Sequence, residues 1–135
     1  MFGKNAKVEL LRRVPLFAEC SKRELGYIAL VADEMSFPAG RTLIEEGKPG
    51  REFFVIGEGT VEVRRGGRKL PQRGDSHSYG EMAIMSGRPR STTVTTTSPV
   101  RAIVITDSAF RQVLQDVPSL RPKLLRSLAA RLAED

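Results

Sequence analysis

The middle of the chain alternates short β-rich segments with glycine, proline and charged turns, and this pattern restricts the fold more than any other feature. Gly66-Gly67 and the segment 48–50 are the clearest turns, and we expect each to supply the positive φ of a tight reversal. Many short strands separated by regular turns are typical of a sandwich or a barrel. β-branched and aromatic residues predict strands at Met35–Phe37, Thr42–Glu45, Phe53–Gly57, Thr60–Arg64, Ser91–Thr96 and Val100–Ile105.

Helical patterns flank the strands on both sides. A first helix is predicted over 4–13, ended by Pro15, and a second follows the Ser21 to Glu24 capping box. Asp107 is expected to cap a helix over 108–115. The last predicted helix, 122–133, is amphipathic. We expect the apolar sides of the second and last helices to comprise Leu25, Ile28, Ala29 and Ala32, and Leu124, Leu125, Leu128 and Leu132, respectively.

The size and composition of the chain fit one domain. Its 135 residues, 40% of them hydrophobic, can bury a core but leave no room for a second domain. Apolar runs are too short to span a bilayer and no signal pattern is visible, so we expect a cytoplasmic location. The single cysteine, Cys20, excludes an internal disulfide and is interpreted as a small buried side chain.

A net charge of +6 raises the question of a nucleic-acid or membrane partner. The basic residues are scattered along the chain and do not form one run, so we interpret most of them as solvated. The positive electrostatic field of these residues would still favour an anionic ligand. No specific DNA binding and no membrane span are expected.

The segment 79–94 has the composition of an anion-binding loop. Gly80 permits a turn, and residues 81–85 are good helix formers whose first amides would point outward. Arg90 follows a proline and offers a planar cationic fork suited to phosphate oxygens. Together with Glu81, which can accept hydrogen bonds from sugar hydroxyls, this arrangement describes a nucleotide site better than a site for bare phosphate.

Gly80-Glu81-Met82-Ala83 followed by Pro89-Arg90-Ser91-Thr92-Thr93-Val94 resembles the phosphate-binding cassette of cyclic nucleotide-binding domains. Segments 37–40, 44–47 and 53–63 also resemble the glycine-punctuated strands of that family. The resemblance implies an eight-stranded jelly-roll, cupin-like β-barrel with flanking helices. It divides the chain into N-terminal helices (1–34), the barrel (35–106) with its cassette (79–94), and C-terminal helices (107–135). The resemblance implies that the last helix acts as a lid; the alternative is a helix permanently docked on the barrel or on a second subunit.

The resemblance also assigns site residues. Glu81 should accept from the ribose 2'-hydroxyl, Arg90 should pair with an exocyclic phosphate oxygen, and Ser91 should donate to the phosphate. The remaining candidates are Gly80, Met82 and Ala83 for backbone contacts, Thr92 at the base edge, Val61 and Val63 as apolar walls, and Arg126 on the lid helix.

One departure from the family pattern lies just before the cassette. In the family a Gly-Asp pair usually lies two residues before the Gly-Glu of the cassette. Here four residues, Ser76-His77-Ser78-Tyr79, separate Gly74-Asp75 from Gly80-Glu81. Either the turn is longer or His77 occupies the acidic position. We interpret His77 as a surface or loop-stabilising residue.

The resemblance implies a regulatory module that binds a cyclic nucleotide, cAMP in preference to cGMP, and moves its C-terminal helix in response. No cofactor, metal or catalysis is expected, because the single histidine excludes a cupin metal centre and no nucleophile stands beside a base. Two alternatives stay open: a ligand-free domain serving as a protein-interaction module, and a truncated transcription regulator without its helix-turn-helix. An effector on a separate or missing domain is expected, and a homodimer is permitted by the terminal leucines.

Overall fold

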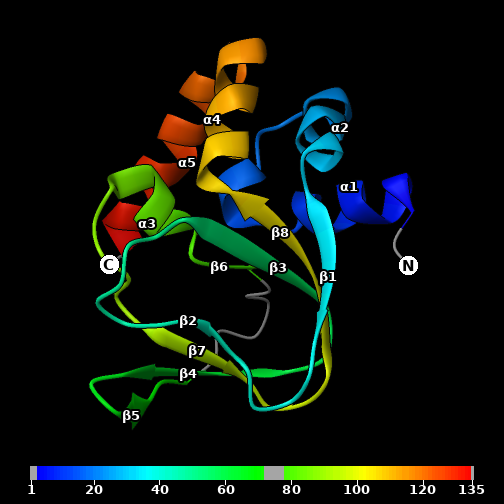
Figure 1. The fold of residues 1–135 in the computed structure, drawn as a ribbon. Coiled ribbons are helices and arrows are strands. Elements are labelled where there is room, and N and C mark those ends of the chain that lie inside the picture. Colours follow the sequence, from blue (N-terminus) through cyan, green and yellow to red (C-terminus); the bar gives the residue numbers. More distant parts are fainter. Residues whose placement is uncertain (1–2, 72–77, 135) are drawn as a thin grey trace.

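A computed structural model describes the backbone of residues 3–71 and 78–134 (Figure 1), and the side chains among them except those of residues 4, 81, 82, 85 and 131–134. No helix in this described part is long and apolar enough to cross a membrane. The helices are α1 (Lys4–Arg12), the 3-10 turn η1 (Pro15–Phe17), α2 (Lys22–Leu30), α3 (Glu81–Ser86), α4 (Asp107–Asp116) and α5 (Leu120–Glu134).

The described strands form two antiparallel sheets of four strands each. The first has the order β1 (Asp33–Phe37), β8 (Val100–Thr106), β3 (Glu52–Glu58) and β6 (Ser78–Tyr79). The second has the order β2 (Thr42–Ile44), β7 (Thr93–Thr96), β4 (Val61–Arg65) and β5 (Arg68–Lys69). All six strands predicted from the sequence are present with shifted ends, whereas the two-residue strands β5 and β6 were not predicted.

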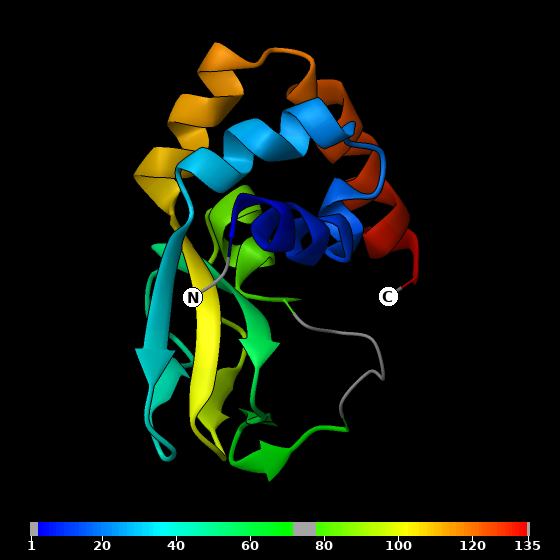
Figure 2. The ribbon, with the colours of Figure 1, turned by 90° about the vertical axis from the view of Figure 1, so that its right-hand side faces the viewer.

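The molecule has three layers. Figures 1 and 2 show the helices gathered above the sheet that contains β3 and β8, with the other sheet below it. Phe53 and Val55 of β3 belong to an outer cluster shared with the helices, whereas Phe54 and Ile56 belong to an inner cluster shared with the second sheet. Successive side chains of a strand point to opposite faces, so β3 contributes to both cores.

This double burial explains the sequence of the central strands. β8 pairs with β3, placing Ile103 and Ile105 in the outer cluster and Ala102 and Val104 in the inner one. A strand covered on both faces reads as a continuous apolar run and shows no alternation. The runs at 53–56 and 102–105 therefore mark the middle layer.

Two local predictions about turns and caps need correction. The positive φ before β3 occurs at Gly47 (φ 86°) and not at Gly50, which lies instead in close contact with Ala83. The cap of α4 is Thr106, whose side chain accepts a hydrogen bond from the Ala109 amide. Asp107 is the first residue of the helix, where its carboxylate pairs with Arg111 and suits the positive end of the helix dipole.

The predicted apolar side of the last helix is only partly correct. Leu124 is buried and Leu128 packs against the outer cluster, but Leu125 is 61% exposed. The side chain of Leu132 is outside the described set. Leu120 and Leu124 anchor the start of α5 in the outer cluster, beside the N-terminal helices.

A buried carboxylate joins the start of α2 to α5. Glu24 completes the predicted capping box with Ser21, and it also accepts hydrogen bonds from Ser119 and Lys123. Burial alone would raise the pKa of Glu24, but the hydrogen bonds from Lys123, Ser119 and Ser21 outweigh it and lower the pKa from its ordinary 4.5 to about 2. Glu24 therefore stays ionised and links the N-terminal helix α2 to the start of the C-terminal helix α5.

This link makes the free energy of unfolding depend on pH in the acid range. Because the pKa of Glu24 is lower in the folded state, its contribution is complete above pH 4.5 and is lost as the pH falls towards 2. We expect Glu24→Gln to lose about 1.5–3 kcal/mol of unfolding free energy at pH 7, the range for hydrogen bonds to a charged group. Urea unfolding of both proteins between pH 7 and pH 2.5 measures the effect.

The matched control is Glu9→Gln, because Glu9 is a well exposed acid paired only with Arg12 among the described residues. It should change stability by less than about 0.5 kcal/mol. The difference between wild type and Glu24→Gln should shrink at low pH. A difference that stays constant down to pH 2.5 would show that ionised Glu24 does not hold α2 to α5.

Candidate functional site

The segment 79–94 leaves the first sheet at β6, forms the predicted short helix α3, and returns to the second sheet at β7. Gly80 is the residue before α3 and has a φ of 98°, and Gly87 ends the helix with a φ of 71°. Both angles lie in the left-handed region that side chains with a Cβ avoid. Two glycines therefore set where α3 starts and stops.

Arg90 is the buried cation of this segment, with only 5% of the residue exposed. Its Nη1 donates to the Gly80 carbonyl at 3.2 Å, and its Nη2 donates to the Glu52 carbonyl at 2.5 Å. The Glu52 carboxylate lies 3.8 Å from Nη2. The guanidinium is thus held between the start of β3 and the start of α3.

The main chain of Arg90 is fixed as firmly as its side chain. Its amide donates to the Lys48 carbonyl at 2.8 Å, and its own carbonyl accepts from the Gly47 amide at 2.9 Å. These bonds explain the positive φ at Gly47, because the loop between β2 and β3 must turn back against Arg90. The loop and the cassette consequently form one unit.

Gly80 is required by space as well as by backbone angle. A Cβ on Gly80 would lie 2.4 Å from Nη1 of Arg90 and 3.1 Å from both the Glu52 carbonyl and Ile44. Gly50 makes a similar approach, since its Cβ would lie 2.5 Å from that of Ala83. The helix α3 therefore sits close against the loop that precedes β3.

The structure brings several other predicted site residues to the same region. Val61 is buried in the inner cluster and Val63 packs against it. Ala83 is half-buried, Ser91 is exposed, and Thr92 is partly buried. Glu81 and Met82 begin α3, but their side chains are outside the described set.

Arg126 is placed elsewhere. Its Nε donates to the Glu19 carboxylate at 2.9 Å, in the connection between η1 and α2, and its side chain is 57% exposed. The structure does not bring Arg126 together with the cassette. Residues 74–77, including His77 and the Gly74-Asp75 pair, lie outside the described residues.

Sequence reasoning missed the partners that position Arg90. Glu52 and Lys48 contribute through backbone carbonyls, and a carbonyl leaves no signal in the sequence. Glu46 was also missed: its amide donates to Thr93 Oγ1 and its carboxylate accepts from the Gly66 amide. Its only detectable signal was its place in the segment 44–47.

This arrangement is suited to binding an anion. A buried guanidinium lies beside the start of a short helix, and the first amides of a helix have no acceptor within the helix itself. Among the described residues no group of three or more His, Cys, Asp or Glu could hold a metal ion.

We predict that Gly80→Ala disrupts this site more than Gly87→Ala does. Both glycines have a positive φ, but only a Cβ at Gly80 would collide, and it would collide with Arg90. Gly80→Ala should lose roughly 2–4 kcal/mol of unfolding free energy, and Gly87→Ala about 1 kcal/mol. Urea unfolding followed by circular dichroism measures both. Equal losses would show that backbone strain, and not contact with Arg90, sets the cost at Gly80.

Comparison with known proteins shows the family to which the chain belongs. Residues 34–117, more than half of the chain, match the family model described as "Cyclic nucleotide-binding domain". A CRP-like cAMP-activated global transcriptional regulator of Mycobacterium tuberculosis is 33% identical over 132 residues, which cover 92% of this chain and 58% of the regulator. A cAMP-dependent protein kinase regulatory subunit of Aspergillus fumigatus is 32% identical over 114 residues, covering 82% of this chain and 27% of the subunit.

A solved structure is also similar. The N-terminal domain of a transcriptional regulator from Streptomyces coelicolor A3(2) superposes with a TM-score of 0.80 at 31% identity, covering 93% of each chain. The chain spans only part of the two curated relatives, 58% and 27% of their lengths. The family model and the level of identity nevertheless agree, and the chain belongs to the cyclic nucleotide-binding domain family.

Proposed function

We propose that this domain binds cAMP in preference to cGMP, and that Arg90 pairs with an exocyclic phosphate oxygen of the ligand. The observation that supports this most directly is the burial of Arg90 between two backbone carbonyls, beside the start of α3. A buried cation that is held in place before the ligand arrives loses little side-chain entropy on binding. It can therefore act as a preformed phosphate anchor.

The other roles follow the order of the cassette. Glu81 accepts from the ribose 2'-hydroxyl, Ser91 donates to the phosphate, and Gly80, Met82 and Ala83 provide backbone contacts. Thr92 lies at the base edge. Val61 and Val63 form the apolar wall of a jelly-roll cage, which is supported by their position on the inner side of β4.

The preference for cAMP has two supports. Ser91 follows Arg90 at a position where some family members carry threonine, associated with guanine, or alanine, associated with adenine; serine is intermediate and resembles the bacterial receptors. The two curated relatives described above are named as cAMP-activated and cAMP-dependent. No catalytic step is part of the proposal, which describes a regulatory module whose output is carried elsewhere.

A ligand-driven change in α5 is the second part of the proposal. Ile84 of α3 packs against the outer cluster, and that cluster also contains Leu120 and Leu124 of α5. A shift of α3 on nucleotide binding would therefore repack the residues that seat α5. The ligand can bias α5 only by the difference between its affinities for the two arrangements. Arg126 would have to leave Glu19 to reach the base.

Titration calorimetry tests the binding site. Cyclic AMP and cGMP are each titrated into wild type, Arg90→Leu and Arg88→Leu, with 5'-AMP as the acyclic control. Arg90→Leu should weaken cAMP binding by about 1.5–3 kcal/mol, or roughly 10- to 150-fold, the range for a hydrogen bond to a charged group. Arg88, an exposed neighbour, should matter little.

Arg90 is buried, so Arg90→Lys serves as a second variant that keeps the charge but loses the planar fork. It should bind more weakly than wild type while remaining folded by circular dichroism. Unchanged affinity in both variants would assign the anchor to another residue. If folded wild type binds neither cyclic nucleotide, the domain is a ligand-free interaction module and the proposal is wrong.

A further inference from the structure

We propose that the groove between α1 and α2 is a docking site for an acidic amphipathic helix of a partner protein. The groove lies on the N-terminal helices, and Arg90 and the cassette take no part in it. The proposal is therefore independent of nucleotide binding.

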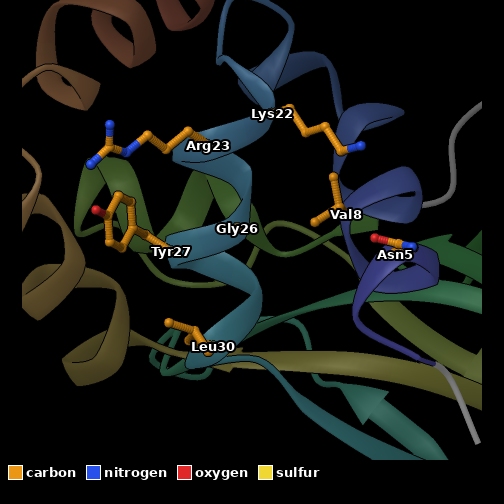
Figure 3. Close-up of a pocket in the computed structure, with 7 residues that line it drawn as sticks. All are labelled: Asn5, Val8, Lys22, Arg23, Gly26, Tyr27 and Leu30. Atoms are coloured by element: carbon orange, nitrogen blue, oxygen red, sulfur yellow. The ribbon is translucent and has the colours of Figure 1, made fainter.

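The groove is a hollow of about 570 Å³. It is lined by Asn5 and Val8 of α1 and by Lys22, Arg23, Gly26, Tyr27 and Leu30 of α2. Figure 3 shows Asn5 and Val8 on the side of α2 that faces α1, Gly26 on α2 itself, and Arg23 and Tyr27 extending from α2 on the side away from α1. A shallow channel between two packed helices fits a third helix, which lays its apolar face between them.

Gly26 leaves the floor of the groove open at a cost to the fold. It lies inside α2, where glycine is less stable than alanine by about 1 kcal/mol. Its φ is not positive, and a Cβ built on it meets no atom within 4 Å. At Gly80 both the backbone angle and the packing require glycine, but at Gly26 neither does. A binding groove whose floor must stay free of side chains would explain the glycine at this position.

Apolar side chains stand exposed on the same face. Tyr27 is 40% exposed and Leu30 is 72% exposed. They are two of the four large hydrophobic residues that are exposed among those described. Tyrosine in particular is enriched where binding energy is concentrated in protein interfaces.

The positive charge of the groove favours an acidic partner. Lys22 and Arg23 are both exposed, and the residues that line the groove include no acid. The nearest acid in α2, Glu24, is buried on another side of the helix with Lys123 and Ser119. On α1 the exposed Glu9 follows Val8 and pairs with Arg12. Glutamates or aspartates flanking the apolar stripe of a partner helix would therefore meet Lys22 and Arg23 on the α2 side of the groove.

The experiment uses a fluorescein-labelled probe peptide of about 18 residues, with leucine at helical positions i, i+3, i+4 and i+7 and glutamate elsewhere. Fluorescence anisotropy should give a Kd in the micromolar range, typical of a small transient interface. A scrambled peptide of the same composition and a peptide with lysine in place of glutamate are the ligand controls. Both should bind at least 10-fold more weakly.

Gly26→Leu is the decisive variant, because leucine favours the helix and finds open space in the domain while filling the groove. It should weaken peptide binding at least 10-fold, with unfolding resistance equal to or above wild type. Its cAMP affinity should match wild type, which separates this test from that of the nucleotide site. Unimpaired peptide binding by Gly26→Leu would overturn the proposal.

A matched pair of charge reversals tests the cationic rim. Arg23→Glu should weaken peptide binding several-fold, whereas Arg13→Glu, an exposed arginine outside the groove, should not. Equal losses of peptide affinity in the two variants would show that only the net charge of the domain matters, and would overturn the proposed docking site. Self-association of wild type that Gly26→Leu abolishes, measured by sedimentation, would assign the groove to a second copy of the chain and also overturn it.

Discussion

The pairing of β3 with β8 is the constraint on which the rest of the structure depends. These strands carry apolar residues on both faces, so they can exist only with helices on one side and a second sheet on the other. That requirement fixes the position of Glu52 at the start of β3. The Glu52 carbonyl in turn accepts a hydrogen bond from the Arg90 guanidinium at 2.5 Å. The packing of the middle layer thereby places the proposed phosphate anchor.

Arg90 carries its charge inside the protein, and a buried charge without partners is strongly destabilising. Here the guanidinium donates to two carbonyls, and the Glu52 carboxylate lies 3.8 Å away. These acceptors offset the loss of hydration while leaving Arg90 positively charged. A phosphate would therefore meet a cation that is already oriented. The net affinity would depend on how many of these protein contacts survive when the phosphate arrives.

The sequence predicted the parts of the fold that depend on local chemistry. The central strands were recognisable from continuous β-branched and aromatic runs, and the start of α2 from the capping box of Ser21 and Glu24. Short strands such as β5 and β6 carry too few residues to show a pattern, so pairing with neighbours determines them. The prediction that Leu125 is buried was wrong. Helical periodicity identifies the apolar side of a helix, but it does not show how much of that side the neighbouring elements cover. At the candidate site, Gly80 and Arg90 could be singled out from the sequence, but the backbone carbonyls that accept hydrogen bonds from Arg90 could not.

The two faces of β3 connect the space between the sheets, where we propose that the nucleotide binds, with the helices on the other side. Phe54 and Ile56 lie in the inner cluster together with Val61, while Phe53 and Val55 lie in the outer cluster that seats Leu120 and Leu124. Close-packed cores shift between discrete arrangements and do not deform continuously. A displacement of α3 through Ile84 would therefore be transmitted to α5 as a repacking. The hydrogen bonds from Lys123 and Ser119 to Glu24 oppose such a movement, so the ligand must supply enough differential binding energy to overcome them.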